Sequence, residues 1–205
     1  MSERSSDPRP PWRDLFDEAA LRRLARLASL RGGEELVWLG ASGQKPAKQL
    51  ERICEARVKV KPDLEGVPKR SLGLIVAPEI VEVMGLDAAL ERSRSALETD
   101  GVVALVLRTV ADGVSVPEDQ RALWERRQHG PLESIMQVLG RFSALGLEPL
   151  TTELSSPRPE AKEPSEANAP GDPAAALHGV RMGLFIGRRV EPGSPPRWPR
   201  RAGME

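Results

Sequence analysis

The sequence contains one cysteine, two histidines and no tyrosine in 205 residues. The single Cys54 excludes an intramolecular disulfide and a cysteine-rich zinc site. A closed metal site would depend mainly on carboxylates, because only His129 and His178 remain as nitrogen ligands, and the sequence shows no such cluster. The absence of tyrosine excludes every enzyme whose chemistry needs that side chain.

Net charge and long hydrophobic runs are also missing. The 30 basic and 30 acidic side chains cancel, so no global positive field indicates a nucleic-acid partner. No window approaches the roughly 18 apolar residues of a membrane-spanning helix, and the polar, proline-rich residues 1–11 are unlike a secretory signal. With a single thiol, these absences predict a soluble, cytoplasmic protein whose partner is a small molecule or another protein. The sequence indicates no oligomeric state.

Short apolar runs alternate with amphipathic segments along the rest of the chain. Nearly continuous apolar runs are typical of strands buried on both faces, and apolar residues at helical spacing are typical of amphipathic helices. Strands are expected at residues 35–39, 57–61, 72–77, 102–107, 149–154 and 180–190. Helices are expected at residues 14–30, 46–55, 87–97 and 132–145. This order predicts a doubly wound α/β domain with a mostly parallel sheet.

A single folded domain is expected over residues 14–190, because this length and 40% hydrophobic residues are enough for one core. Residues 1–13 are predicted to be a flexible N-terminus. Residues 155–176 consist mostly of proline and of small or polar residues. Because this segment is too polar to bury a core, it is predicted to be a flexible insertion. The proline- and arginine-rich residues 191–205 are predicted to be a flexible tail.

A glycine-containing turn follows the first predicted strand. Residues 39–44 read Leu-Gly-Ala-Ser-Gly-Gln, and a helix is expected to open at Pro46. In doubly wound sheets, ligands lie beyond the carboxyl ends of the strands, where such a turn lets them approach the backbone N–H groups of the helix. The turn therefore either holds a ligand or is a tight connection without one.

One resemblance of this turn is to NAD(P)-binding proteins of the short-chain dehydrogenase type. That family has a third glycine where this chain has Pro46, and its catalytic motif is Tyr-x-x-x-Lys. Because the chain has no tyrosine, a working enzyme of this type is excluded. An NAD(P)-binding relative stays open.

The rest of the chain resembles the class I S-adenosylmethionine-dependent methyltransferases more closely. Residues 72–82, 87–97 and 100–107 are similar to the fourth strand, the following helix and the glycine-led fifth strand of that family. Residues 132–149 resemble its next helix and the approach to the sixth strand, and residues 180–190 resemble its antiparallel seventh strand. The resemblance implies a Rossmann-like sheet with an antiparallel last strand, and S-adenosylmethionine as the cofactor.

Several positions depart from the cofactor motifs of this family. Trp38 stands where the family has an acidic residue, and Ser42 and Gln44 replace two glycines of the turn. Lys61 stands where the family has the carboxylate that binds the ribose hydroxyls, with Asp63 just beyond able to substitute. The region between the second predicted strand and residue 72, where the family's fourth strand would begin, is too short to leave much room for a normal third strand and its helices. Cofactor binding is therefore expected to be weak, rebuilt or lost, and Trp38 is interpreted as core or as a plug in a vacated pocket.

The candidate site residues follow from this resemblance. Its cofactor-binding positions in this chain are Gly40, Ala41, Ser42, Gly43, Asp63 and Glu79. Glu79 and Glu82 either face the methyl donor and acceptor or are acids favoured by the dipole at a helix start. His129 is either a general base for an acceptor or a solvated loop residue. Trp124 and its neighbouring arginines form either a partner-binding patch or a surface helix, and Cys54 is interpreted as a small core residue.

These patterns leave three functional hypotheses. One is a catalytically silent relative, a pseudoenzyme whose fold binds a partner protein. Another is an active methyltransferase for a small molecule or a protein, with the donor over the glycine turn and the acceptor near Glu79 and His129. The third is a dinucleotide-binding relative. Binding of S-adenosylmethionine, its demethylated product or NADP distinguishes the three.

Overall fold

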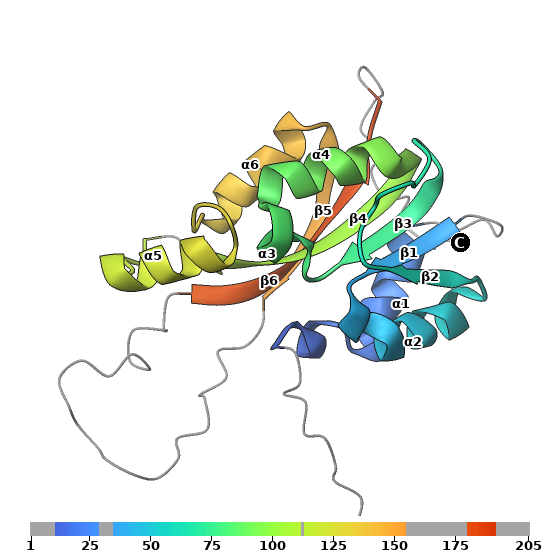
Figure 1. Ribbon diagram of the computed structural model, residues 1–205, viewed down its shortest axis with the longest axis horizontal. Coiled ribbons are helices and arrows are strands. Elements are labelled where there is room, and N and C mark those ends of the chain that lie inside the picture. Colours follow the sequence, from blue (N-terminus) through green and yellow to red (C-terminus); the bar gives the residue numbers. More distant parts are fainter. Residues whose placement is uncertain (1–10, 29–34, 112, 155–179, 192–205) are drawn as a thin grey trace, which may run out of the picture.

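The computed structural model describes residues 11–28, 35–111, 113–154 and 180–191, and it places a six-stranded sheet between two helical layers (Figure 1). The strands are β1 Glu35–Leu39, β2 Val58–Lys61, β3 Leu72–Ala77, β4 Leu97–Val110, β5 Leu147–Leu154 and β6 Val180–Arg189. The α-helices are α1 Glu18–Leu27, α2 Gln44–Cys54, α3 Ile80–Met84, α4 Leu86–Ala96, α5 Glu118–Arg127 and α6 Ile135–Ala144. Two short 3-10 helices, η1 Pro11–Leu15 and η2 Ala41–Gly43, complete the described elements.

The strand order is β2-β1-β3-β4-β6-β5. Neighbours among β2, β1, β3 and β4 are parallel, whereas β6 runs antiparallel to both β4 and β5. This order confirms the doubly wound, mostly parallel sheet with a reversed last strand beside β4. Residues 62–71 form turns without a strand between β2 and β3, as their short length indicated.

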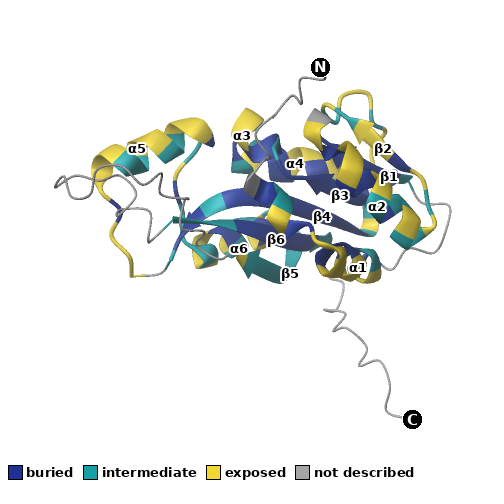
Figure 2. Ribbon diagram, turned by 90° about the horizontal axis from the view of Figure 1, so that it is seen from below, coloured by how far each residue is buried: buried dark blue, intermediate teal, exposed yellow. Residues whose placement is uncertain are grey.

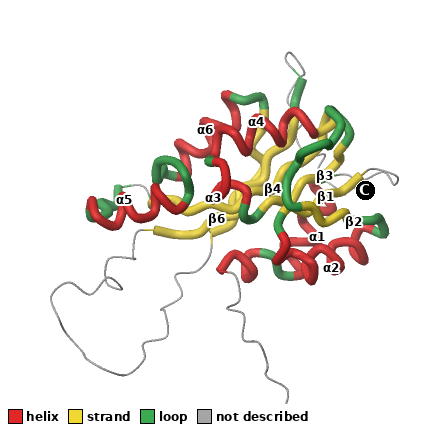
Figure 3. The backbone as a smooth tube through the Cα atoms, in the orientation of Figure 1, coloured by secondary structure: helices red, strands yellow, loops and turns green. Residues whose placement is uncertain are grey.

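Each face of the sheet is covered by different helices (Figures 1 and 3). Helices α1 and α2 pack on the face that includes Leu36, Trp38 and Val76. Helices α3, α4 and α6 pack on the opposite face, which includes Val37 and Leu39. The inner strands are buried on both faces (Figure 2), which is why they read as nearly continuous apolar runs rather than alternating ones.

The sequence predicted one helix over residues 14–30, but the structure has two shorter elements in this part of the chain, η1 and α1. Helix α1 begins only after Asp17, whose carboxylate accepts a hydrogen bond from the backbone N–H of Ala20 at 2.8 Å and caps the helix. Before it, η1 carries Trp12 into the core with 4% of its surface exposed. The folded part therefore begins earlier than the predicted domain boundary at residue 14, because η1 includes residues 11–13.

Strand β4 is longer than the predicted strand over residues 102–107. The Asp100-Gly101 turn signal falls inside it, where Asp100 has a φ of 68° and the register between β3 and β4 shifts. A left-handed residue inside a strand ladder makes a bulge and does not end the strand. The turn signal therefore does not end the strand: Leu97 pairs with Leu72 before it and Val102 pairs with Leu74 after it, whereas pairing with β6 begins only at Val102.

Two of the described helices, α3 and α5, were not among the helices expected from the sequence. Helix α3 is short, and Gly85, with a φ of 79°, separates it from α4. Helix α5 lies at one end of the sheet with most of its surface exposed (Figure 2). Its Trp124 packs against Arg108 and Arg127, whose guanidinium carbons lie 4.3 Å and 5.0 Å from the ring centroid. This arrangement matches the surface-helix interpretation of Trp124.

Some predicted features lie outside the described residues. These are the N-terminal residues 1–10, the whole of the predicted insertion 155–176, the predicted tail except Glu191, and His178. Within the described part, Cys54 packs against the core cluster on the α1–α2 face, and partial burial raises the pKa of its thiol. No helix in the described ranges has the length and apolar character of a membrane span.

Candidate functional site

The glycine turn lies at the carboxyl edge of the sheet, at the point where the strand order reverses. Strand β1 lies between β2 and β3, and the backbone N–H of Gly40 donates to the carbonyl oxygen of Lys61 at the end of β2 at 2.9 Å. Gly40 has a φ of 108°, and a Cβ added to it would lie 2.7 Å from Oε2 of Glu79. The turn is therefore positioned where ligands of this class of sheet bind, and Gly40 permits its close approach to Glu79.

Trp38 fills the space directly against this turn. Its side chain is 0% exposed, and a Cβ added to Gly43 would lie 1.7 Å from the indole Nε1. The rings of Phe16 and Trp12 pack on it, with centroids 5.0 Å and 6.0 Å away. Strand alternation explains the direction of Trp38, because it shares the α1–α2 face with Leu36.

Glu79 connects this aromatic cluster to the turn. Its Oε1 accepts a hydrogen bond from the indole Nε1 of Trp12 at 3.0 Å and another from the hydroxyl of Ser42. The structure thus brings together Gly40, Ser42 and Glu79, three of the residues expected at a cofactor. Sequence patterns did not indicate Trp12, which lies 67 positions from its partner.

Asp63 forms a local contact. One of its carboxylate oxygens accepts a hydrogen bond from the backbone N–H of Glu65 at 2.8 Å, inside its own turn. Ala41 belongs to η2, the 3-10 helix that follows Gly40. No group of three or more His, Cys, Asp or Glu side chains that could hold a metal occurs among the described residues.

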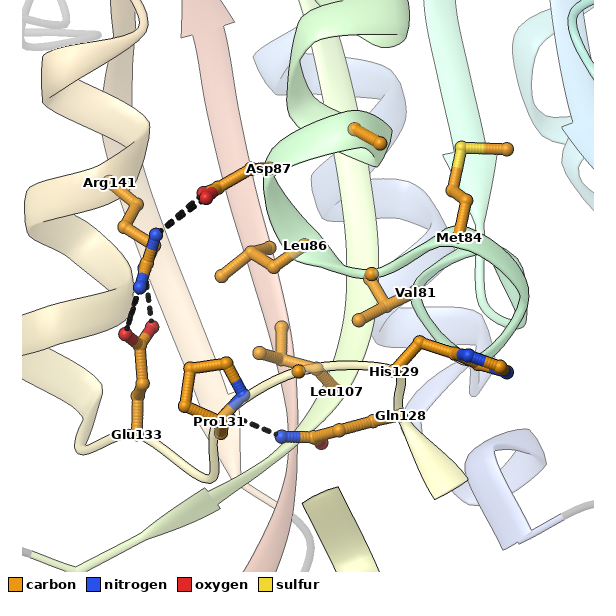
Figure 4. Close-up of a pocket in the computed structure, with 13 residues that line it drawn as sticks. Val81, Met84, Leu86, Asp87, Leu107, Gln128, His129, Pro131, Glu133 and Arg141 are labelled. Atoms are coloured by element: carbon orange, nitrogen blue, oxygen red, sulfur yellow. Dashed lines mark hydrogen bonds and ion pairs between the residues drawn. The ribbon is translucent and has the colours of Figure 1, made fainter. Parts of the chain in front are cut away.

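His129 lies in a different region, at a cavity of about 260 Å³ between the starts of α4 and α6 (Figure 4). Arg141 forms one wall of this cavity and bridges two acids. Its Nε lies 2.8 Å from both carboxylate oxygens of Glu133, and its Nη1 lies 2.7 Å and 2.8 Å from those of Asp87. Hydrogen bonds to Glu133 and then to Asp87 raise the pKa of Arg141, which keeps the guanidinium charged.

The loop that carries His129 is held against the junction of α3 and α4. A Cβ added to Gly85 would lie 2.7 Å from the carbonyl oxygen of His129, so only glycine fits at this backbone contact. The His129 side chain is exposed. Glu79 and Glu82 are not in the wall of this cavity, and Glu82 is paired with Arg108.

A groove of about 790 Å³ runs between α1 and α2, and no sequence signal indicated it. Arg22, Lys45, Lys48 and Arg52 line it, together with Glu18 and Glu55. Arg22 is paired with Glu18 at 2.7 Å, whereas Lys45, Lys48 and Arg52 form no ion pair with any residue that the structure describes. Because these three cations recur at helical spacing, they lie along one side of α2. The net charge of the whole chain does not reveal this local cluster.

The fold is that of the class I S-adenosylmethionine-dependent methyltransferases, as comparison with solved structures shows. Geranyl diphosphate C-methyltransferase from Streptomyces coelicolor A3(2), solved with Mg²⁺, geranyl diphosphate and S-adenosyl-L-homocysteine, is 15% identical with a TM-score of 0.56, covering 84% of this chain and 77% of that one. Haemonchus contortus phosphoethanolamine N-methyltransferase 2 with S-adenosyl-L-methionine is 13% identical with a TM-score of 0.53, covering 88% of this chain and 59% of that one. The [4+2]-cyclase SpnF is 16% identical with a TM-score of 0.56, covering 84% and 80%.

No family model matches the sequence, and no curated protein matches it. The likeness to solved structures therefore establishes the fold, while the sequence has diverged widely. Two of these structures hold S-adenosylmethionine or S-adenosylhomocysteine, which makes this cofactor the ligand associated with the fold. SpnF is a [4+2]-cyclase, so the fold alone does not assign an activity.

Proposed function

We propose that this chain is a catalytically silent methyltransferase-like domain that acts as a protein-binding scaffold in the cytoplasm. The observation that carries the silent half of the proposal is Trp38, fully buried against Gly43 at the position where the family has an acidic residue. An acidic side chain there would help to hold the methionine end of the cofactor. An indole in its place offers no acceptor and occupies the space beside the turn.

Opening this site has a large energetic cost. Trp38 is one of the largest fully buried side chains, and it packs against Trp12 and Phe16. Removing the packing of a buried tryptophan costs about 3–5 kcal/mol, which corresponds to a loss of about 10²- to 10³-fold or more in affinity for a ligand that must displace it. Glu79, the remaining acid beside the turn, already accepts hydrogen bonds from Trp12 and Ser42.

The ribose end of the expected cofactor also lacks its usual partner. Lys61 ends β2, and a lysine side chain has donors only, whereas a ribose diol is bound best by a carboxylate that accepts from both hydroxyls. Asp63 uses one oxygen for the backbone of its own turn. Each lost hydrogen bond to a charged group removes about 1.5–3 kcal/mol of binding free energy, so both ends of the cofactor would bind weakly.

The scaffold half of the proposal rests on the groove between α1 and α2. Lys45, Lys48 and Arg52 are without ion-pair partners in the described part of the chain, and they line a concave surface. Unpaired cations in a groove favour an acidic segment of a partner protein, because complementary charge steers association and selects the partner. The proposed partner is therefore a protein with an acidic docking segment.

The silent half predicts that S-adenosylmethionine does not change thermal stability. A ligand present at 100 times its dissociation constant stabilises the folded state by about 2.7 kcal/mol, which for a domain of this size raises Tm by roughly 5–10 °C. We expect no rise in Tm, measured by circular dichroism, with millimolar S-adenosylmethionine or S-adenosylhomocysteine. A saturable rise of several degrees with either compound would contradict the proposal. NADP, tested in the same way, addresses the dinucleotide-binding alternative.

The scaffold half predicts that charge reversal in the groove abolishes partner binding. Three proteins would be immobilised: the wild type, the groove variant Lys45→Glu/Lys48→Glu and the control variant Lys69→Glu/Arg92→Glu. The partner proteins that each of them retains from a cell extract would then be quantified. The control carries the same charge change at exposed positions outside the groove. We expect the wild type and the control to retain the same partner proteins, and the groove variant to retain at least about tenfold less of them. The amount retained should fall as the salt concentration increases. Equal retention by all three proteins, or none by the wild type, would contradict it.

A further inference from the structure

Helix α2, one wall of the groove between α1 and α2, carries a charge at each end that the helix dipole disfavours. The dipole stabilises acidic side chains near a helix N-terminus and basic side chains near its C-terminus. The first turn of α2 contains Lys45 and no acid, while the exposed Glu55 directly follows the last helical residue. Both side chains line the groove. Each end of α2 therefore presents to the groove a charge that lowers the stability of the helix.

The cations of α2 also repel one another. Lys45, Lys48 and Arg52 are spaced by three and four residues, which makes them neighbours on one side of the helix, and like charges at this spacing are destabilising. Only Arg52, in the last turn, is favoured by the dipole. None of the three forms an ion pair with a residue in the described part of the chain. The negative charge that would relieve this row is therefore left for a partner to supply.

Glu55 has an unfavourable backbone conformation as well as an unfavourable charge. Its φ of 52° is left-handed, and the left-handed residue after a helix is usually glycine, because a side chain is strained there. Departures from local rules are expected at functional sites. The opposite wall adds no net charge, because Glu18 and Arg22 are paired at 2.7 Å. The groove thus has a row of positive charge along α2 and one negative charge at the end of that row.

We propose that the partner segment in this groove combines an acidic stretch with one basic end and docks in a single direction. The acidic stretch lies against Lys45, Lys48 and Arg52, and the basic end lies against Glu55. Lys45 and Glu55 are about 15 Å apart along the helix at 1.5 Å per residue, a length that about five or six residues of an extended segment cover. This inference rests on the proposed scaffold role and describes the partner segment of that role.

Two synthetic peptides that differ only at one end test this charge order. The first has five glutamates followed by two lysines, and the second has seven glutamates. Both carry a fluorophore, and fluorescence anisotropy gives their dissociation constants for the full chain. The wild type is expected to bind the lysine-ended peptide at least about threefold more tightly, although the other peptide has the larger negative charge. Equal binding, tighter binding of the seven-glutamate peptide or no binding of either would overturn the proposal.

The outcomes separate this proposal from the scaffold role. Groove-dependent retention of proteins from a cell extract, combined with equal binding of the two peptides, would refute the charge order alone. The absence of retained proteins would refute the scaffold role itself.

A substitution at Glu55 locates the preference. Glu55→Lys extends the row of positive charge, so this variant should bind the seven-glutamate peptide more tightly than the lysine-ended one. Glu65→Lys makes the same charge change at an exposed position outside the groove and should keep the wild-type preference. A preference for the lysine-ended peptide that survives in Glu55→Lys would overturn the proposal.

A substitution at Lys45 tests whether stability is given up for binding. Lys45→Glu places an acid in the first turn of α2, so the free variant should melt about 1–3 °C higher than the wild type. The same variant should bind the lysine-ended peptide at least about threefold more weakly. Lys69→Glu, outside the groove, should change neither quantity. Unchanged peptide binding by Lys45→Glu, or a lower melting temperature, would contradict the assignment of this surface.

Discussion

Replacing Trp38 with alanine is expected to lower the free energy of unfolding by about 3–5 kcal/mol, the usual loss for a fully buried tryptophan. The substitution removes the packing partner of Trp12 and Phe16 and leaves a cavity beside Gly43. Urea unfolding followed by far-ultraviolet circular dichroism measures the change without relying on tryptophan fluorescence. Trp124→Ala is the matched control, because the same substitution at a partly exposed ring should cost clearly less.

A double-mutant cycle makes this expectation specific to the glycine turn. Gly43 has a φ of −83°, so its backbone tolerates alanine, and any cost of Gly43→Ala comes from the indole that lies where the new Cβ would be. In the Trp38→Ala background the added methyl group enters vacated space. The two substitutions should therefore couple by about 2–3 kcal/mol. Additive effects would mean that Trp38 does not occupy this place in solution.

The second large effect is expected at Arg189, near the opposite end of the core. This side chain is only 5% exposed, and its Nη1 donates to the carbonyl oxygens of Leu97 at 2.5 Å and Arg94 at 3.1 Å. Burial, followed by the nearby Arg70, lowers the pKa of Arg189. Its hydrogen bonds thus join β6 to the end of α4.

Arg189→Met should lower the free energy of unfolding by about 2–4 kcal/mol, because it keeps the aliphatic stem but leaves buried carbonyl oxygens without donors. Arg188→Met is the matched control at the adjacent residue, which is less buried and whose Nη2 donates to the carbonyl oxygen of Leu27 at 3.3 Å. The comparison uses urea unfolding of both variants. Equal stability of the two would show that the Arg189 hydrogen bonds contribute little.

The sequence predicted the strands of the sheet better than the ends of its helices. Strands β1 and β3 lie at the predicted residues, because each is a short apolar run with turn residues on both sides. The start of α1 was missed because Asp17 caps it, while the apolar spacing begins earlier in η1. The length of β4 depends on pairing with β3 and β6, which local patterns do not contain.

The site was predicted in part. The glycine turn at the carboxyl edge follows from the strand–turn–helix order. The burial of Trp38 agrees with both of its interpretations, as a core residue and as a plug, and the plug interpretation stays a prediction. The contact of Trp12 with Glu79 could not be predicted, because it depends on residues brought together only by the folded chain. For the same reason, His129 and Glu79, predicted to share a site, stand at separate features of the described structure.

Isothermal titration calorimetry of the full chain with S-adenosylhomocysteine tests the central claim most directly, because this compound carries both the adenosyl and the amino-acid ends of the cofactor without reacting. If the aromatic residues beside Gly43 fill the site, the titration should give only heats of dilution up to millimolar ligand. A saturable heat with one-to-one stoichiometry and a micromolar dissociation constant would contradict the closed site and favour an active methyltransferase.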